Sequence, residues 1–230
     1  LPGLQQWETQ FLAQQQSETP VAQRNWQAVE ERFLAELAAR EDLSDATKAA
    51  AHVRLLLQQR RHEEAQARLD AALAESPPEL DLRMVAIEVT QARNGSAAAL
   101  AQLRGIKADI QDSARLRLFE AALIGAVGED DVAEQLLALE MDAKELGDEE
   151  LDQLRRGLGV IHRRLGNLTA ARRLWSAAAE AQPNDVDLRI SLFELARAQG
   201  DMQQMQTLAE GIKESAGAGS ATWKLIEATR

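Results

Sequence analysis

The residue types that most often carry catalysis are few and scattered in this chain. Its three histidines are His52, His62 and His162, and it has no cysteine. The run His62-Glu63-Glu64 lacks the second histidine, one turn further on, that a zinc-binding helix requires. No Gly-rich phosphate loop or nucleophile elbow is present either. The sequence therefore predicts no metal and no cofactor, and it predicts a protein that is not an enzyme.

Carboxylates cluster at two places, in residues 129–131 (Glu-Asp-Asp) and in residues 148–150 (Asp-Glu-Glu). Neither run has the alternation of acidic residues and the glycine of a calcium-binding loop. Both are followed by apolar residues at helical spacing, and negative charge at a helix start complements the helix dipole. Both clusters are therefore predicted to begin helices.

The overall charge opposes two classes of partner. With 26 Lys and Arg against 37 Asp and Glu, the 230 residues carry a net charge of -11 and have a pI of about 4.9. Such a chain repels phosphate backbones and anionic lipid surfaces. We expect no nucleic acid partner.

The chain also lacks an obvious membrane or targeting segment. The apolar run over residues 121–127 is far shorter than the roughly 20 residues that span a bilayer, so we expect no direct membrane insertion of this segment. No signal segment opens the chain, and the absence of cysteine is compatible with any compartment. The localisation therefore stays unknown. Because residue 1 is leucine, we expect a segment of a longer protein.

Composition and periodicity both indicate helices. The 42 alanines and 33 leucines favour helix, and 3% aromatic content is too little for a sandwich or a barrel. Apolar residues recur at helical spacing, as in Val53, Leu56 and Leu57, and short polar breaks separate stretches of about a dozen residues. These stretches predict antiparallel helix hairpins, arranged either as a compact orthogonal bundle or as a repeat array.

Residues 152–185 resemble a tetratricopeptide repeat (TPR), a two-helix unit of about 34 residues. The residues that match the family pattern are Leu158, Gly159, Gly166, Asn167, Ala171, Trp175, Ala178 and Pro183. Two positions depart from it: Arg155 stands where the family usually carries Trp, and His162 where it usually carries Tyr. At that position we expect a satisfied interior histidine rather than a ligand.

Weaker matches extend the resemblance over nearly the whole chain. The small-residue places are Ala65, Ala99, Ala133, Ala171 and Met205, which are 34, 34, 38 and 34 residues apart. An insertion of four residues around 145–150 accounts for the longer spacing. We expect one TPR-like array over residues 1–230, with units 4–42 (degenerate), 46–79, 80–113, 114–151, 152–185, 186–219 and 220–230, the last being the start of a further unit.

The resemblance implies an all-α fold, an α-solenoid of antiparallel helix hairpins wound as a right-handed superhelix. Small residues let two helix axes approach closely, and each hairpin leaves apolar surface that only the next one covers. Trp26 and Trp175 fall at apolar places of second helices, so we expect them to pack rather than to stack on a ligand. Trp223 falls where the family prefers Trp in a first helix, and we expect it to pack back on residues 186–219 while part of its helix stays exposed and apolar.

The family's binding surface is its concave face, lined by one side of each first helix. Transferred unit by unit, the resemblance implies these peptide-binding residues: Arg54, Met84, Glu88, Arg115, Leu118, Phe119, Arg156, Val160, Arg163, Ile190, Glu194 and Arg197. Apolar centres beside arginines suit a protein or peptide partner with acidic and apolar side chains. The alternative is that these arginines are solvated or pair with Glu88, Glu194 and other carboxylates. The Asn and Lys set that clamps a chaperone tail in some family members is absent.

Three functions remain open at this point. The first is a non-catalytic protein-protein interaction scaffold that binds a peptide or partner helix in the concave groove, as part of a longer, bacterial TPR protein. The second is a regulatory or sensor segment attached to a catalytic or transmembrane domain outside these residues. The third is an enzyme on a solenoid platform, which would need a convergent acid, base and nucleophile.

Overall fold

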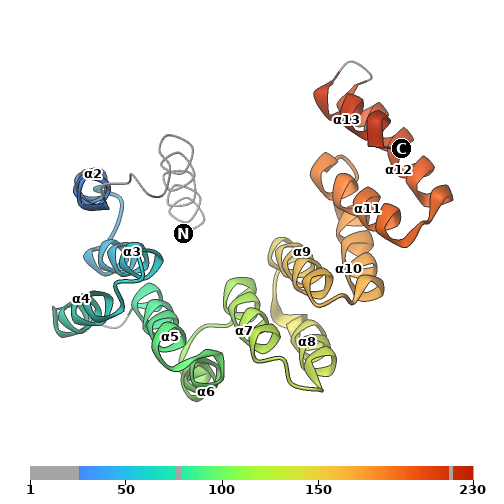
Figure 1. Ribbon diagram of the computed structural model, residues 1–230. Helices are drawn as coiled ribbons and strands as arrows, with labels where there is room; N and C mark the ends of the chain where they lie inside the picture. Colours follow the sequence, from blue (N-terminus) through green and yellow to red (C-terminus); the bar gives the residue numbers. More distant parts are fainter. Residues whose placement is uncertain (1–25, 76–78, 218–219, 230) are drawn as a thin grey trace. The chain divides into compact units, whose positions relative to one another are not determined.

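A computed structural model describes residues 26–75, 79–217 and 220–229. The predicted first helix at residues 4–16 and Pro77 lie outside the described residues, as does the side chain of Trp26. Every regular element in the described residues is a helix, which confirms the all-α prediction. The helices, labelled in Figure 1, are α2 (Trp26–Ala38), α3 (Asp45–Gln58), α4 (His62–Glu75), α5 (Leu80–Asn94), α6 (Ser96–Ile106), α7 (Ala114–Val127), α8 (Val132–Met141), α9 (Asp148–Arg164), α10 (Leu168–Ala181), α11 (Val186–Gln199), α12 (Met202–Ala216) and α13 (Ala221–Thr229).

The chain divides into two compact units, residues 1–110 and 111–230. In the first unit α3 pairs with α4, α5 pairs with α6, and α3 also packs on α5. Its main core joins Val53 and Leu56 of α3 to Ala65 and Leu69 of α4 and to Val85 of α5. A short 3-10 helix, η2 (Lys107–Asp109), follows α6.

The second unit contains three further hairpins, α7 with α8, α9 with α10, and α11 with α12. Helix α9 also packs on α7, and α11 packs on α10. One core cluster includes Trp175 of α10 and Leu192 of α11, and the next includes Phe193 of α11 and Ile212 of α12. A 3-10 helix, η3 (Ala143–Glu145), lies between α8 and α9.

Polar side chains and glycines set the helix boundaries at the predicted breaks. Asn167 and Asp201 each accept a hydrogen bond at the start of the following helix, from the N–H of Ala170 and of Gln204. Gly200 ends α11 in the left-handed region, at φ 71°, where a side chain would be strained. The acidic residues 148–150 occupy the first turn of α9, as predicted.

The second helices of the hairpins are α4, α6, α8, α10 and α12. The predicted small-residue place lies at the same position in each of them except α8. Ala65, Ala99, Ala171 and Met205 are each the fourth residue of their helix, and each is buried. The sequence-based placement of Ala133 was wrong, because Ala133 is exposed and is only the second residue of α8. The loop after Gly128 delays the start of α8 to Val132, so Leu136 is the first buried residue of that helix.

The first helices α3 and α5 of successive hairpins contact each other through residues one repeat length apart. The Thr47 hydroxyl of α3 donates to Asp81 of α5, and Arg54 of α3 donates to Glu88 of α5. Both pairs are 34 residues apart in the sequence. In the second unit, α9 has 17 residues where α3, α5, α7 and α11 have 14 or 15, so it is two or three residues longer.

The C-terminal helix α13 packs on α12. Trp223 and Ile226 are buried against Phe193, Met205 and Ile212, so Trp223 does pack back on the preceding hairpin. Among the described side chains of α13, Lys224, Glu227, Ala221 and Ala228 are exposed, so the expectation of an exposed apolar part stays a prediction. The side chain of Leu225 lies outside the described residues.

Candidate functional site

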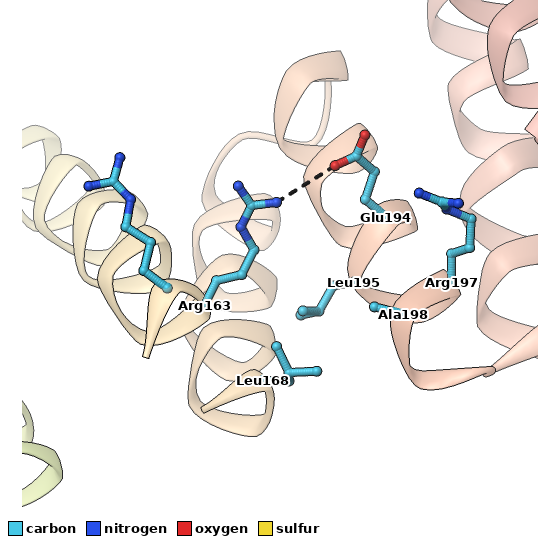
Figure 2. A pocket seen from close by; sticks show the side chains of 7 residues that line it. Arg163, Leu168, Glu194, Leu195, Arg197 and Ala198 are labelled. Carbon is cyan, nitrogen blue, oxygen red and sulfur yellow. Dashed lines mark ion pairs between the residues drawn. The ribbon is translucent and has the colours of Figure 1, made fainter. Parts of the chain in front are cut away.

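Three of the predicted binding residues meet in one groove of the second unit. Arg163 comes from the last turn of α9, and Glu194 and Arg197 come from the exposed side of α11. Figure 2 shows the Arg163 and Glu194 side chains pointing toward each other across this groove. Its volume is about 430 Å³. The lining, which we call the arginine groove, consists of Arg163, Arg164, Leu168, Glu194, Leu195, Arg197 and Ala198.

The packing of α9 on α10 positions the arginine side of the groove. Trp175 of α10 is 3% exposed, and its indole N–H donates to the carbonyl oxygen of Arg156 at 3.1 Å. Its ring lies directly against Gly159, at a position where even a Cβ atom would collide with the indole. Trp175 is therefore a packing residue, as predicted, and it fixes how far α9 stands from α10.

The charges in the groove are only partly neutralised. Arg163 and Glu194 approach to 3.7 Å between nitrogen and oxygen, with side chains 47% and 52% exposed. The Arg163 guanidinium also lies 5.8 Å from the centre of the Trp175 ring, within the range of a cation–π contact. Arg164 and Arg197 are exposed, and neither has a partner among the described residues. The groove is thus cationic on an acidic protein.

The floor of the groove is apolar. Leu195 of α11 is 2% exposed and belongs to the same core cluster as Trp175, and Leu168 of α10 packs on that cluster. Ala198 adds a small side chain beside Arg197 on α11. The groove thus combines apolar side chains with guanidinium groups.

The other predicted residues of the second unit lie outside this groove. Arg156 donates to Asp152 at 2.6 Å and also pairs with Asp185, which fits the alternative in which such arginines join carboxylates of the chain itself. Val160 and Ile190 pack against core clusters. The remaining predicted residues of this unit, all partly buried on α7, are Arg115, Leu118 and Phe119. The Leu118 side chain occupies the space that the missing side chain of Gly157 leaves on α9.

The three predicted residues of the first unit form no open site among the described residues. Met84 is 3% exposed, so it offers little surface to a ligand. Arg54 donates to both carboxylate oxygens of Glu88 at 3.1 Å, with side-chain exposures of 12% and 26%. This pair joins α3 to α5 and corresponds to the alternative of internal pairing.

Sequence reasoning missed several residues that matter here. Arg164, Leu168, Leu195 and Ala198 line the groove, and the Arg163-Arg164 pair beside a helix end was the available signal. Arg117 was also missed: it is 6% exposed and donates to the carbonyl oxygens of Leu139 and Asp142, at 2.6 and 2.9 Å, and to Asp112. Nothing in the sequence marks it, because it stands in an apolar helix face that a charged residue rarely enters.

The histidines show no catalytic arrangement among the described residues. The His52 ring lies 2.9 Å from Glu30, in a network with Arg61 and Glu64. The Glu30 pKa is lowered despite its burial, because Arg61 and His52 hydrogen-bond to it. No group of three His, Asp or Glu residues in the described part of the chain is placed to hold a metal ion. None of the described helices combines the length and the apolarity that a membrane crossing requires.

His162 is interior, as predicted. It is 5% exposed, and its ring has no hydrogen-bond partner in the described residues. Burial lowers its pKa, the Arg173 charge lowers it further, and the Glu140 charge raises it.

No family model and no curated protein matches this chain. Among solved structures, a tetratricopeptide repeat protein from Parabacteroides merdae aligns with a TM-score of 0.51 and 13% identity, over 96% of this chain and 84% of that one. PilF of Pseudomonas aeruginosa aligns with a TM-score of 0.49 and 12% identity, over 90% of this chain and 100% of that one. YrrB, a TPR protein with an unusual peptide-binding site, aligns with a TM-score of 0.45 and 16% identity, over 86% of this chain and 99% of that one. At these identities the likeness concerns the fold, which is that of a TPR-like α-solenoid.

Proposed function

We propose that this TPR-like chain is a non-catalytic protein-protein interaction scaffold, and that the arginine groove binds a peptide or partner helix with acidic and apolar side chains. The observation that carries the proposal is the meeting of three arginines over an apolar floor on a protein of net charge -11. A local field opposite in sign to the whole molecule selects ligands that the rest of the surface repels.

The weak internal pairing of the groove favours an acidic ligand. An exposed ion pair contributes about 0.2 to 1 kcal/mol, so the Arg163–Glu194 contact at 3.7 Å is easily exchanged. An incoming carboxylate can form shorter, charge-assisted hydrogen bonds with Arg163, and with Arg164 and Arg197, which have no partner among the described residues. The ligand therefore replaces a weak contact and adds new ones.

The floor explains why the ligand should also carry apolar residues. Leu168, which is partly buried, and the exposed Ala198 provide a surface against which leucine-like side chains lose contact with water, at about 25 cal/mol per Å². A helix or an extended segment that alternates acidic and apolar residues would satisfy both parts of the groove.

The test is fluorescence anisotropy with two labelled twelve-residue peptides, one alternating Glu with Leu and one alternating Gln with Leu. We expect the Glu peptide to bind at least tenfold more tightly, and added salt to weaken its binding. The double substitution Arg164→Ala with Arg197→Ala should weaken it roughly tenfold, which corresponds to about 1.4 kcal/mol.

The matched control is Arg68→Ala with Arg93→Ala. It removes the same charge from residues 1–110, outside the arginine groove. Equal binding of the Glu and Gln peptides, or equal losses in the two double variants, would contradict the assignment of the groove.

A further inference from the structure

A second pocket lies where the loop after α7 meets the last turns of α9. Its volume is about 310 Å³, and Val132, Leu136 and Leu165 give it apolar walls. His162 lines it from α9, while Glu129 and Asp130 line it from the loop. We call it the acidic pocket. It shares no lining residue with the arginine groove, and its charge is opposite.

His162 supplies a hydrogen-bond acceptor inside this pocket. Burial and the neighbouring Arg173 lower its pKa, and Glu140, which raises it, is paired with Arg173. The ring is therefore neutral near pH 7, and one of its nitrogens carries a lone pair. Among the described residues no donor reaches this ring. The neutral ring can therefore accept a hydrogen bond from a donor outside the chain that enters the pocket.

Neither carboxylate at the pocket has an ion-pair partner among the described residues. Glu129 and Asp130 are both exposed. Glu129 accepts one hydrogen bond, from Gln135 at 3.2 Å, and Asp130 has no partner in the described part of the chain. Arg173, whose charge lowers the pKa of His162, is already bound to Glu140.

We propose that the acidic pocket binds an arginine side chain of a partner protein. The aliphatic stem would lie against Val132 and Leu165, and the guanidinium would donate to the His162 ring and to the carboxylates of Glu129 and Asp130. Arginine fits this combination because it presents five donors in a fixed fork and is more weakly hydrated than an ammonium group. The inference does not depend on a ligand in the arginine groove.

Other occupants fit the same residues less well. An anion would meet two carboxylates and a neutral ring. The compact ammonium of lysine is strongly hydrated and gives up more on entering a pocket with apolar walls. The choice of arginine therefore follows from the charge at the rim, the acceptor inside and the apolar walls together.

The experiment uses the whole chain and small probes at pH 7.5. Nα-acetylarginine methylamide is titrated while the ring signals of the three histidines are followed by NMR, with assignments from His→Gln variants. We expect the His162 signal to shift and to saturate, and the His52 signal to stay. Nα-acetylcitrulline methylamide has a similar shape without charge, and it should shift His162 at least fivefold less at the same concentration.

Two double variants test the carboxylates. Glu129→Gln with Asp130→Asn should weaken binding of the arginine probe at least fivefold. Asp148→Asn with Glu149→Gln removes the same charge from another exposed acidic run and should leave it unchanged. Thermal melts of both variants check the fold. The proposal is overturned if citrulline binds as well as arginine, if an acetylglutamate probe shifts His162 instead, or if the two double variants lose binding equally.

Discussion

Each compact unit has one arginine–glutamate pair between the first helices of successive hairpins. The two pairs differ in their nitrogen–oxygen distance and in the exposure of their side chains. Arg54 of α3 donates to both oxygens of Glu88 on α5 at 3.1 Å, and its side chain is 12% exposed. Arg163 of α9 approaches Glu194 of α11 only to 3.7 Å, and its side chain is 47% exposed. The residue types are the same, but the first pair is closed and the second borders a groove.

The surroundings of each pair explain the difference. In the first unit α3 packs on α5, so the two side chains are held together between packed helices. In the second unit the Trp175 ring fills the space against Gly159, and α11 packs on α10 through Leu188, Leu192 and Leu195. An arginine of a first helix is thus accessible only where the helix packing leaves room beside it.

The largest effect is expected from a substitution that disrupts the packing of α9 on α10, beside the Arg163–Glu194 pair. Trp175→Ala removes a ring that is 3% exposed, together with its hydrogen bond to Arg156, and should destabilise the second unit by roughly 3 to 5 kcal/mol. Urea denaturation, followed by circular dichroism, measures the change. An unchanged midpoint would mean that the ring does not hold α9 against α10.

A smaller loss of stability is expected at Ala171 and not at Ala133, although the 34-residue spacing predicts equivalent places for both alanines. Ala171 is 0% exposed at the fourth position of α10, so Ala171→Leu should overpack the hairpin and cost about 1 to 3 kcal/mol. Ala133 is exposed, so Ala133→Leu should change the stability by less than about 0.5 kcal/mol. Thermal melts of the two variants give the comparison, and equal losses would show that Ala133 is a packing residue after all.

The fold was predictable because its signals are local. Periodic apolar residues and capping groups such as Asn167 and Asp201 mark most helix boundaries before any tertiary contact is known. The failure at Ala133 is also local in origin: counting 34 residues assumes that each second helix starts at the same place, and the loop before Val132 does not obey that rule. Spacing in the sequence cannot distinguish a longer loop from a longer helix.

The candidate site was less predictable, because exposure depends on packing between hairpins. The family resemblance indicated twelve binding residues, and the structure brings Arg163, Glu194 and Arg197 together in the groove. The same rule also selected Met84, which is buried, and Arg54, whose partner is 34 residues away. The sequence lists candidates for a concave face, but the distances between helices decide which of them a ligand can reach.

A third prediction sharpens the comparison of the two pairs directly. A double-mutant cycle with Arg54→Ala and Glu88→Ala should give a coupling of about 1 kcal/mol, because this pair is close and only partly exposed. The corresponding cycle with Arg163→Ala and Glu194→Ala should give about 0.3 kcal/mol or less, because that pair is long and solvated. Urea denaturation of the parent chain and the six variants, in low salt, measures both couplings. Equal values would remove the basis for calling the second pair open.

The smallest expected effect concerns His162, whose neutral form the second unit favours. Its pKa is lowered from the ordinary value of 6.5, chiefly by burial, so the unfolded chain binds a proton more readily than the folded one. Stability from this residue is therefore complete above pH 6.5, and it decreases as the pH falls from 6.5 toward the folded-state pKa. Carboxylates with lowered pKa values, such as Glu30 and Asp185, change their charge at more acidic pH and so affect stability there.

His162→Phe places an aromatic ring where the TPR pattern has one and removes the titrating group. The melting temperature of this variant should therefore change less between pH 7 and pH 5.5 than that of the parent chain. His62→Gln removes a histidine elsewhere and serves as the control. If His162→Phe and the parent lose the same number of degrees over that interval, the buried histidine does not make the second unit sensitive to acid.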